Sequence, residues 1–236
     1  MRRIGSALAV AALAFCGAAS AARADRPVIL ELFTSEGCSS CPPADAVLRD
    51  LARTRADVLP LAFHVTYWDY LGWHDPFALQ AATQRQRAYA AALPSDVYTP
   101  QLVVDGRTDV VGSDRPATLA AIRRAASADA AAVPVTLRRD GNEAVIEIAA
   151  GTAAPGTTVL LVGYDPEHTT SIGRGENGGR TLVEANIVRS LATAAAWSGD
   201  RVTLRRPLPA GEKLAVVIQA SDGRILGAAR ESEHAS

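Results

Sequence analysis

The sequence contains few cysteines and no excess of charge of either sign. Its 236 residues include three cysteines, and 24 lysines and arginines stand against 25 aspartates and glutamates. A chain without a basic excess is not expected to bind nucleic acid or an anionic membrane surface. So few cysteines cannot form a disulfide framework that ties distant segments together. With 48% hydrophobic residues the composition is that of a globular protein, long enough for one large domain or two small ones.

Long hydrophobic runs are also lacking, apart from a short one near the N-terminus. Two arginines precede an apolar stretch over residues 7–19, and a small-x-small triplet follows at 22–24. This order is typical of a secretory signal peptide, so residues 1–24 are expected to be cleaved off. The mature protein is therefore expected to be periplasmic or secreted, without membrane insertion.

Cleavage would leave Cys38 and Cys41, in a CxxC motif, as the cysteines of the mature chain. A disulfide between them closes a short loop, which constrains the unfolded chain weakly, so chemistry explains the pair better than stability does. The motif lies between a predicted strand and a predicted helix, where N–H groups and the helix macrodipole stabilise a thiolate. Cys38 is therefore the expected nucleophile and Cys41 the resolving thiol. Because Pro43 would disrupt a helix that began at Cys38, the regular helix is expected to begin nearer Cys41.

The first part of the chain alternates predicted strands and helices, and the second part contains predicted strands only. The first elements are a strand over 27–33, a helix over 44–52, a strand over 58–65, a helix over 79–92, a β-hairpin at Asp105-Gly106 and a helix over 115–127. After an alanine-rich connector, short strands are expected at 135–137, 145–148, 159–162, 202–204, 214–218 and 225–226. The sequence thus predicts an α/β domain over 25–130 and a smaller all-β, sandwich-like domain over 131–236.

Two segments of the first part resemble the thioredoxin superfamily. One is the strand, CxxC motif and helix around Cys38, and the other is Tyr98-Thr99-Pro100 before the predicted hairpin. The resemblance implies a thioredoxin-like fold for residues 25–130 and a cis peptide bond at Pro100 that lies against the cysteine pair. It also implies that the backbone of Thr99 pairs with an extended substrate. The two serines between the cysteines depart from the superfamily, so the redox potential is left open.

Longer segments are similar to an exported bacterial family, domain of unknown function 1223. The segments are 30–45, which contains the CxxC motif, 63–73, which is rich in aromatic residues, and 175–182, which is rich in glycine. The similarity extends over nearly all of the mature chain. It implies a thioredoxin-like domain and brings no substrate with it.

The cysteine pair also admits other interpretations. One alternative is a purely structural role, in which the pair is a static local disulfide or two buried thiols that do not react. A soft dithiolate also suits Cu(I), and His64, at the end of a predicted strand, would complete such a site. Alternatively, His64 is hydrogen-bonded to the backbone. Zinc needs about four ligands, and the sequence has no second CxxC motif.

Aromatic residues are scarce, at 5% of the chain, but they cluster. Tyr67, Trp68, Tyr70 and Trp73 lie within seven positions, which is typical either of a recognition wall beside an active site or of a packed anchor between domains. We take Trp68 as a substrate contact.

Three further patterns favour simple structural interpretations. Residues 173–178 match GxGxxG, but no βαβ unit opens there, so a glycine-rich hairpin turn is expected instead of a dinucleotide site. Arg85, Arg87 and Tyr89 are expected on the solvated side of their helix. Neither a nucleophile elbow nor a Walker-type loop occurs, so hydrolase and phosphoryl-transfer classes have no support. No cofactor or resident metal is expected.

The sequence therefore predicts an exported thiol–disulfide oxidoreductase that acts on a protein or a small-molecule thiol or disulfide. Cys38 and Cys41 are the predicted catalytic residues, and Thr99, Pro100 and Trp68 are the predicted substrate contacts. Folding is expected to bring the sulfur of Cys38 to solvent beside Pro100. Whether the protein oxidises, reduces or isomerises is left open. The alternative is a periplasmic copper-binding or protein-interaction module that uses the same dithiol as a ligand or as a structural disulfide.

Overall fold

The structure is a computed structural model that describes residues 26–128 and 132–232. The predicted signal peptide over 1–24 lies outside the described residues. Along the chain the elements are β1 (Val28–Thr34), α1 (Pro42–Thr54), β2 (Val58–His64), η1 (Thr66–Leu71), α2 (Gln80–Ala92), β3 (Gln101–Val104), β4 (Thr108–Val111), α3 (Arg115–Ala128), β5 (Val135–Asp140), β6 (Glu143–Ile148), β7 (Thr158–Ser171), β8 (Thr181–Ala196), β9 (Val202–Pro207), β10 (Lys213–Gln219) and β11 (Ile225–Arg230). Among the described helices, none is both long enough and apolar enough to cross a membrane.

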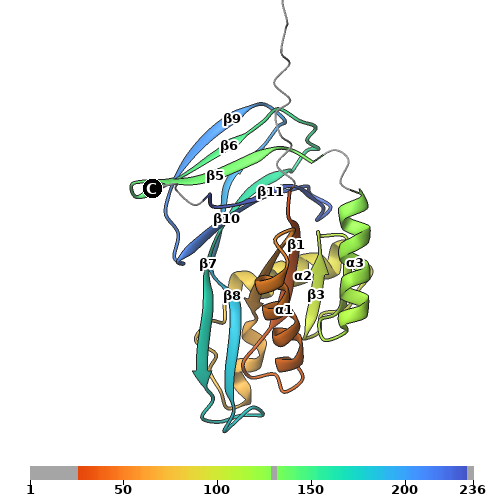
Figure 1. The fold of residues 1–236 in the computed structure, drawn as a ribbon, viewed down its shortest axis with the longest axis vertical. Helices are drawn as coiled ribbons and strands as arrows, with labels where there is room; N and C mark the ends of the chain where they lie inside the picture. The colour runs from red at the N-terminus through yellow and green to blue at the C-terminus, as the bar shows by residue number, and fades with distance from the viewer. Residues whose placement is uncertain (1–25, 129–131, 233–236) are drawn as a thin grey trace, which may run out of the picture.

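One mixed sheet of eight strands runs through the molecule, in the order β11-β10-β7-β8-β2-β1-β3-β4 (Figure 1). In its centre β1 is parallel to β2 and antiparallel to β3. β8 lies beside β2 and pairs with it in parallel at Ala62 and Ile187. Strands β5, β6 and β9 form a second, antiparallel sheet of three strands.

The side chains of β1 alternate between two apolar cores. Leu30 and Leu32 pack in one core with α1 and α3, whereas Ile29 and Phe33 pack in the other core with α2. Because successive side chains of a strand point to opposite faces, α2 covers one face of the sheet and α1 and α3 cover the other. This double burial explains why β1 is an almost continuous apolar run. The three-stranded sheet packs on β7 and β10 in a third core.

The predicted fold class is wrong, although the elements predicted in the first part occur close to their expected ranges. The prediction was an α/β thioredoxin-like N-terminal domain followed by a smaller all-β, sandwich-like domain. Instead, β7, β8, β10 and β11 extend the same sheet as β1 to β4, so the described chain is mostly β, with four helices. Whether the segments on either side of residue 130 fold independently stays a prediction.

The strand that joins the two parts of the sheet, β8, is absent from the predicted elements. Its 16 residues include Glu184, Asn186 and Arg189 and end in alanines, so they lack a clear apolar alternation. Asn186 has a positive φ of 51°, and its amide donates to the carbonyl oxygen of Pro60 in β2 at 2.7 Å. Polar contacts thus help to make this joint, and strand periodicity gives no signal for them.

Candidate functional site

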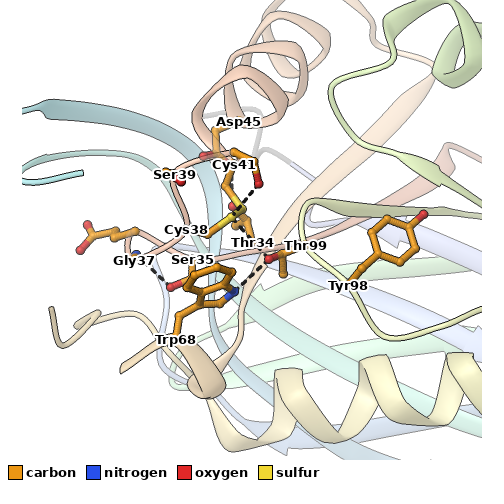
Figure 2. Close-up of a disulfide and its surroundings, with 12 residues drawn as sticks. Thr34, Ser35, Gly37, Cys38, Ser39, Cys41, Asp45, Trp68, Tyr98 and Thr99 are labelled. Atoms are coloured by element: carbon orange, nitrogen blue, oxygen red, sulfur yellow. Dashed lines mark hydrogen bonds between the residues drawn. A yellow bond between two sulfur atoms is a disulfide. The ribbon is translucent and has the colours of Figure 1, made fainter. Parts of the chain in front are cut away.

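Cys38 and Cys41 lie in the turn between β1 and α1, residues 35–41, which we name the cysteine turn, and they form a disulfide (Figure 2). The N–H of Cys38 donates to the carbonyl oxygen of Ser35 at 3.1 Å, and the N–H of Cys41 donates to that of Cys38 at 3.2 Å. Both cysteines are 0% exposed. The expectation that the sulfur of Cys38 reaches solvent is therefore wrong.

Helix α1 begins at Pro42, with Cys41 as its N-cap. Prolines fit the first two helical positions, because an N–H group there would have no partner within the helix. The next two N–H groups, those of Ala44 and Asp45, both donate to the carbonyl oxygen of Cys41, at 2.8 Å and 3.1 Å. The first turn of α1 therefore offers no free N–H group to Cys38, contrary to one part of the predicted thiolate stabilisation. The contribution of the helix macrodipole stays a prediction.

Side-chain hydroxyl groups contact the sulfur of Cys38 instead. Thr99 donates through Oγ1 to Cys38 Sγ at 3.4 Å, and Oγ of Ser40 lies 3.4 Å from the same sulfur. Trp68 donates through Nε1 to Oγ1 of Thr99 at 2.9 Å (Figure 2). The hydroxyl of Thr99 thus accepts from the indole and donates to the sulfur. The Thr99–Pro100 peptide bond is cis, as the resemblance implied.

The aromatic cluster does not form a single wall. Tyr70 is 80% exposed, whereas Tyr67, Trp68 and Trp73 are half-buried. The hydroxyl of Tyr67 donates to a glutamine of α2, and Nε1 of Trp73 donates to Oε2 of Glu36 at 2.7 Å. Three of the four aromatic side chains thus anchor the segment around η1 to its surroundings. The structure brings the predicted contacts Trp68 and Thr99 together beside the cysteine pair.

The tip of the β7–β8 hairpin, residues 172–180, contacts the cysteine turn, and we did not predict this contact from the sequence. Asn177 is 0% exposed. Its Nδ2 donates to the carbonyl oxygens of Glu36 and Cys38, both at 2.9 Å. A buried amide with both hydrogens bonded to one turn fixes the backbone of that turn.

The neighbouring residue of the tip, Glu176, contacts the same turn at the surface. Its Oε2 accepts from the backbone N–H of Ser39 at 3.2 Å and from Oγ of Ser39 at 2.6 Å. These two hydrogen bonds hold the pKa of Glu176 below its usual value. The GxGxxG pattern is a turn, but the residues between its glycines contact the cysteine turn. The similarity of 175–182 to a family was the one signal in the sequence that singled them out.

Five buried ionisable side chains interact beside the cysteine turn, and they are Glu36, Asp45, His64, Asp75 and Glu184. Nδ1 of His64 lies 2.7 Å from Oδ2 of Asp75, and its Nε2 lies 3.6 Å from Oε1 of Glu184. Asp75 also accepts from the N–H of Glu36 at 2.9 Å. His64 is thus paired with carboxylates, and copper binding by the reduced cysteine pair stays a prediction. Among the described residues, no three His, Cys, Asp or Glu side chains are arranged to hold a metal ion.

Burial and charge oppose each other within this cluster. Burial alone would lower the pKa of His64, but attraction to Asp75 and Glu184 raises it to about 10. Burial raises the pKa of Asp45 to about 6 and that of Glu184 to about 8, although the charge of His64 opposes both shifts. Burial would also raise the pKa of Asp75, but the charge and hydrogen bond of His64 hold it below its usual value. At neutral pH the raised pKa of His64 keeps its imidazole protonated beside the ionised Asp75.

Two solved structures are similar to this chain. A crystal structure of a protein from Agrobacterium tumefaciens is 32% identical, covers 89% of this chain and 95% of its own, and has a TM-score of 0.73. HBP35 of Porphyromonas gingivalis is 15% identical, covers 88% of this chain and 75% of its own, and has a TM-score of 0.58, which shows a similar fold alone. Among curated proteins, none matches the chain. The model of a family described as "Protein of unknown function (DUF1223)" matches residues 29–219, so the chain belongs to the DUF1223 family.

Proposed function

We propose that the protein is an exported thiol–disulfide oxidoreductase whose Cys38–Cys41 disulfide exchanges with the thiols of a substrate. The observation that carries the proposal is the chain of hydrogen bonds from Trp68 through Thr99 to the sulfur of Cys38. Hydrogen bonds to an ionised acceptor are about twice as strong as those between neutral groups. These donors therefore favour Cys38, rather than Cys41, as the thiolate of the reduced pair. The signal-peptide pattern supports export.

In the oxidising direction a substrate thiolate attacks Sγ of Cys38. A bond forms between the two sulfurs, and the Cys38–Cys41 bond breaks with its electron pair on Cys41. The second substrate thiolate then attacks the substrate sulfur of the mixed disulfide and releases Cys38 as a thiolate. Two electrons pass from the substrate to the cysteine pair, one substrate proton passes to Cys41, and the other passes to solvent because Cys38 leaves as a thiolate. The reducing direction is the reverse of these steps.

Exchange requires side chains above the sulfur to move first, because both cysteines are fully buried. The sulfur of Cys38 contacts two side chains that reach solvent, namely the exposed Ser40 and the half-buried Thr99. Rotation of these two side chains is the shortest opening that would admit a substrate thiol. The decisive measurement is therefore whether Cys38 reacts with a small disulfide while the protein remains folded.

Cysteine-to-serine variants test the proposal. Cys41→Ser leaves Cys38 free, and the native variant should form a mixed disulfide with oxidised glutathione at least about tenfold faster than Cys38→Ser does. The two variants lose the same disulfide, so each is the matched control of the other for stability. Mass spectrometry of the adducts measures both rates. Equal rates, or no adduct on either native variant, would contradict the proposal.

Thr99→Val should lower the reactivity of Cys38, because valine keeps the shape of threonine but has no hydroxyl donor. In the Cys41→Ser background the rate with oxidised glutathione at neutral pH is expected to fall about tenfold, since a hydrogen bond to a charged group contributes about 1.5 kcal/mol or more. Trp68→Phe should act in the same direction and more weakly, because the indole only orients Thr99. The rates are measured from neutral to alkaline pH. If the rate falls by the same factor at every pH, the substitution has altered access to the sulfur. If the rate recovers at alkaline pH, the substitution has made the thiolate less stable.

A second candidate function, a protein-interaction module with a structural disulfide, is favoured by the complete burial of both cysteines. A structural pair would be reduced only when the whole protein unfolds. The rate of reduction by a small dithiol, compared with the rate of global unfolding, separates the two functions. Equality of these two rates would support the structural disulfide and contradict the oxidoreductase.

A further inference from the structure

We propose that the tip of the β7–β8 hairpin clamps the peptide unit between Cys38 and Ser39 and thereby favours the disulfide over the dithiol. Asn177 and Glu176 are positioning residues in this clamp, since they hold the backbone of the cysteine turn and act on the sulfur through it. The consequence for exchange rests on the proposed function, whereas the effect on the disulfide itself does not.

The clamp holds both polar groups of one peptide unit. Asn177 donates to the carbonyl oxygen of Cys38, and Glu176 accepts from the N–H of Ser39, the next residue. These contacts join positions that are 139 and 137 residues apart in the chain. The carbonyl oxygen of Cys38 also accepts from the N–H of Cys41, so the same clamp fixes one end of the hydrogen bond that spans the CxxC motif.

The tip is itself held in place, so it can restrain the turn. The N–H of Gly178 donates to the carbonyl oxygen of Gly175 at 3.0 Å, and Gly175 adopts a positive φ of 76°. A Cβ atom at Gly175 would lie 3.2 Å from Cβ of Trp73, so the tip packs closely on the segment after η1. Nη1 of Arg180 donates to Oδ1 of Asn177 at 3.0 Å, which directs the amide hydrogens of Asn177 toward the cysteine turn.

A fixed turn favours the disulfide for an entropic reason. A turn held in one geometry keeps the two thiols close, which raises the effective concentration of each thiol near the other and favours the disulfide. A mobile turn gains conformational freedom when the disulfide opens, which favours the dithiol. Glu176 adds an electrostatic effect, because its carboxylate beside Ser39 disfavours a thiolate on the neighbouring cysteine. Both effects shift the equilibrium toward the oxidised pair.

The equilibrium between disulfide and dithiol in mixtures of reduced and oxidised glutathione tests the clamp. In the native mature protein, which lacks the expected signal peptide, Asn177→Ala should shift the equilibrium constant about tenfold toward the dithiol, which is about 30 mV in potential. Glu176→Gln keeps an acceptor for Ser39 and removes the charge, so it should give a smaller shift in the same direction. Asn186→Ala is the matched control, because it removes an amide-to-carbonyl hydrogen bond from β8 to Pro60 instead of to the cysteine turn. It should leave the equilibrium constant unchanged.

Each outcome decides for or against the clamp. An unchanged constant for Asn177→Ala, or a shift no larger than that of Asn186→Ala, overturns it. If Asn177→Ala does not fold, Glu176→Ala at its exposed position replaces it, and a shift no larger than that of Glu176→Gln overturns the clamp. The expected shifts together with an unreactive Cys41→Ser variant would uphold the clamp and overturn the oxidoreductase. A reactive Cys41→Ser variant with no shift for Asn177→Ala would overturn the clamp alone.

Discussion

Replacing Arg85 by alanine is expected to lower the free energy of unfolding by about 3–5 kcal/mol. The guanidinium of Arg85, in α2, donates to both carboxylate oxygens of Glu31 in the central strand β1. Glu31 is 1% exposed, and it also accepts from the hydroxyl of Tyr89 at 2.8 Å. Without Arg85 this carboxylate would stay buried without its charged partner, and breaking a buried ion pair has an effect of that size.

Urea denaturation of three variants measures this contribution. Arg87→Ala is the matched control, because Arg87 is exposed on the same helix and its loss should change the free energy of unfolding by less than about 0.5 kcal/mol. The double variant Glu31→Gln/Arg85→Met should recover much of the loss, since it leaves no unpaired charge in the core. A loss below about 1 kcal/mol for Arg85→Ala would show that the pair does not hold α2 on the sheet.

The stability of the protein is expected to fall as the pH rises from about 5 to about 9. Three buried groups hold their protons more tightly in the native state than their usual pKa values allow. The pKa of Asp45 is about 6 instead of 3.8, that of Glu184 is about 8 instead of 4.5, and that of His64 is about 10 instead of 6.5. A group with a raised native pKa contributes stability below its unfolded value, and this stability is lost as the pH rises through the native value.

The losses of stability that come from Asp45, Glu184 and His64 occur at successively higher pH, and all three lower the free energy of unfolding as the pH rises. Each additional proton on the native state gives a slope of up to about 1.4 kcal/mol per pH unit. Asp75 acts in the opposite direction, because its pKa is lowered, but its contribution is lost only as the pH falls below 3.8. Glu36, whose pKa is raised by burial, adds to the loss at rising pH.

Urea denaturation at about pH 5, 7 and 9 measures the predicted decline. Glu184→Gln removes one titrating group, so its slope between about pH 6 and 8 should be smaller than that of the unaltered protein by about 1 kcal/mol per unit. A stability that stays level or rises over this range would contradict the prediction. It would mean that Asp45 and Glu184 ionise in the native protein at pH values below their raised pKa values of about 6 and about 8.

Local patterns in the sequence predicted local structure well. The β-hairpin at Asp105-Gly106 has φ values of 56° and 63° at these residues, the positive values that turns of this composition favour. The helix after the cysteines begins at Pro42, as the position of Pro43 implied. These features depend on residues a few positions apart, so the chain contains their cause locally.

The environment of Arg85 shows where local patterns were insufficient. From the sequence we expected Arg85 and Tyr89 on the solvated side of their helix, whereas both contact the buried Glu31. The alanine-rich helix α2 lacks a marked apolar stripe, so periodicity could not identify its buried face. That face became visible only through its partners in β1 and β10, because Nη1 of Arg85 also donates to Gln219 at 3.0 Å.

By itself, the sequence determined the elements of the first part and the position of the cysteine pair between a strand and a helix. The hydrophobic period, the turn residues and the two prolines act over short distances, so they need no knowledge of the fold. Only the tertiary structure decided that both cysteines are buried, that β8 joins the two parts into one sheet and that Asn177 holds the carbonyl oxygen of Cys38. The last two features arise from contacts between residues more than a hundred positions apart, and such contacts leave no periodic trace in the chain.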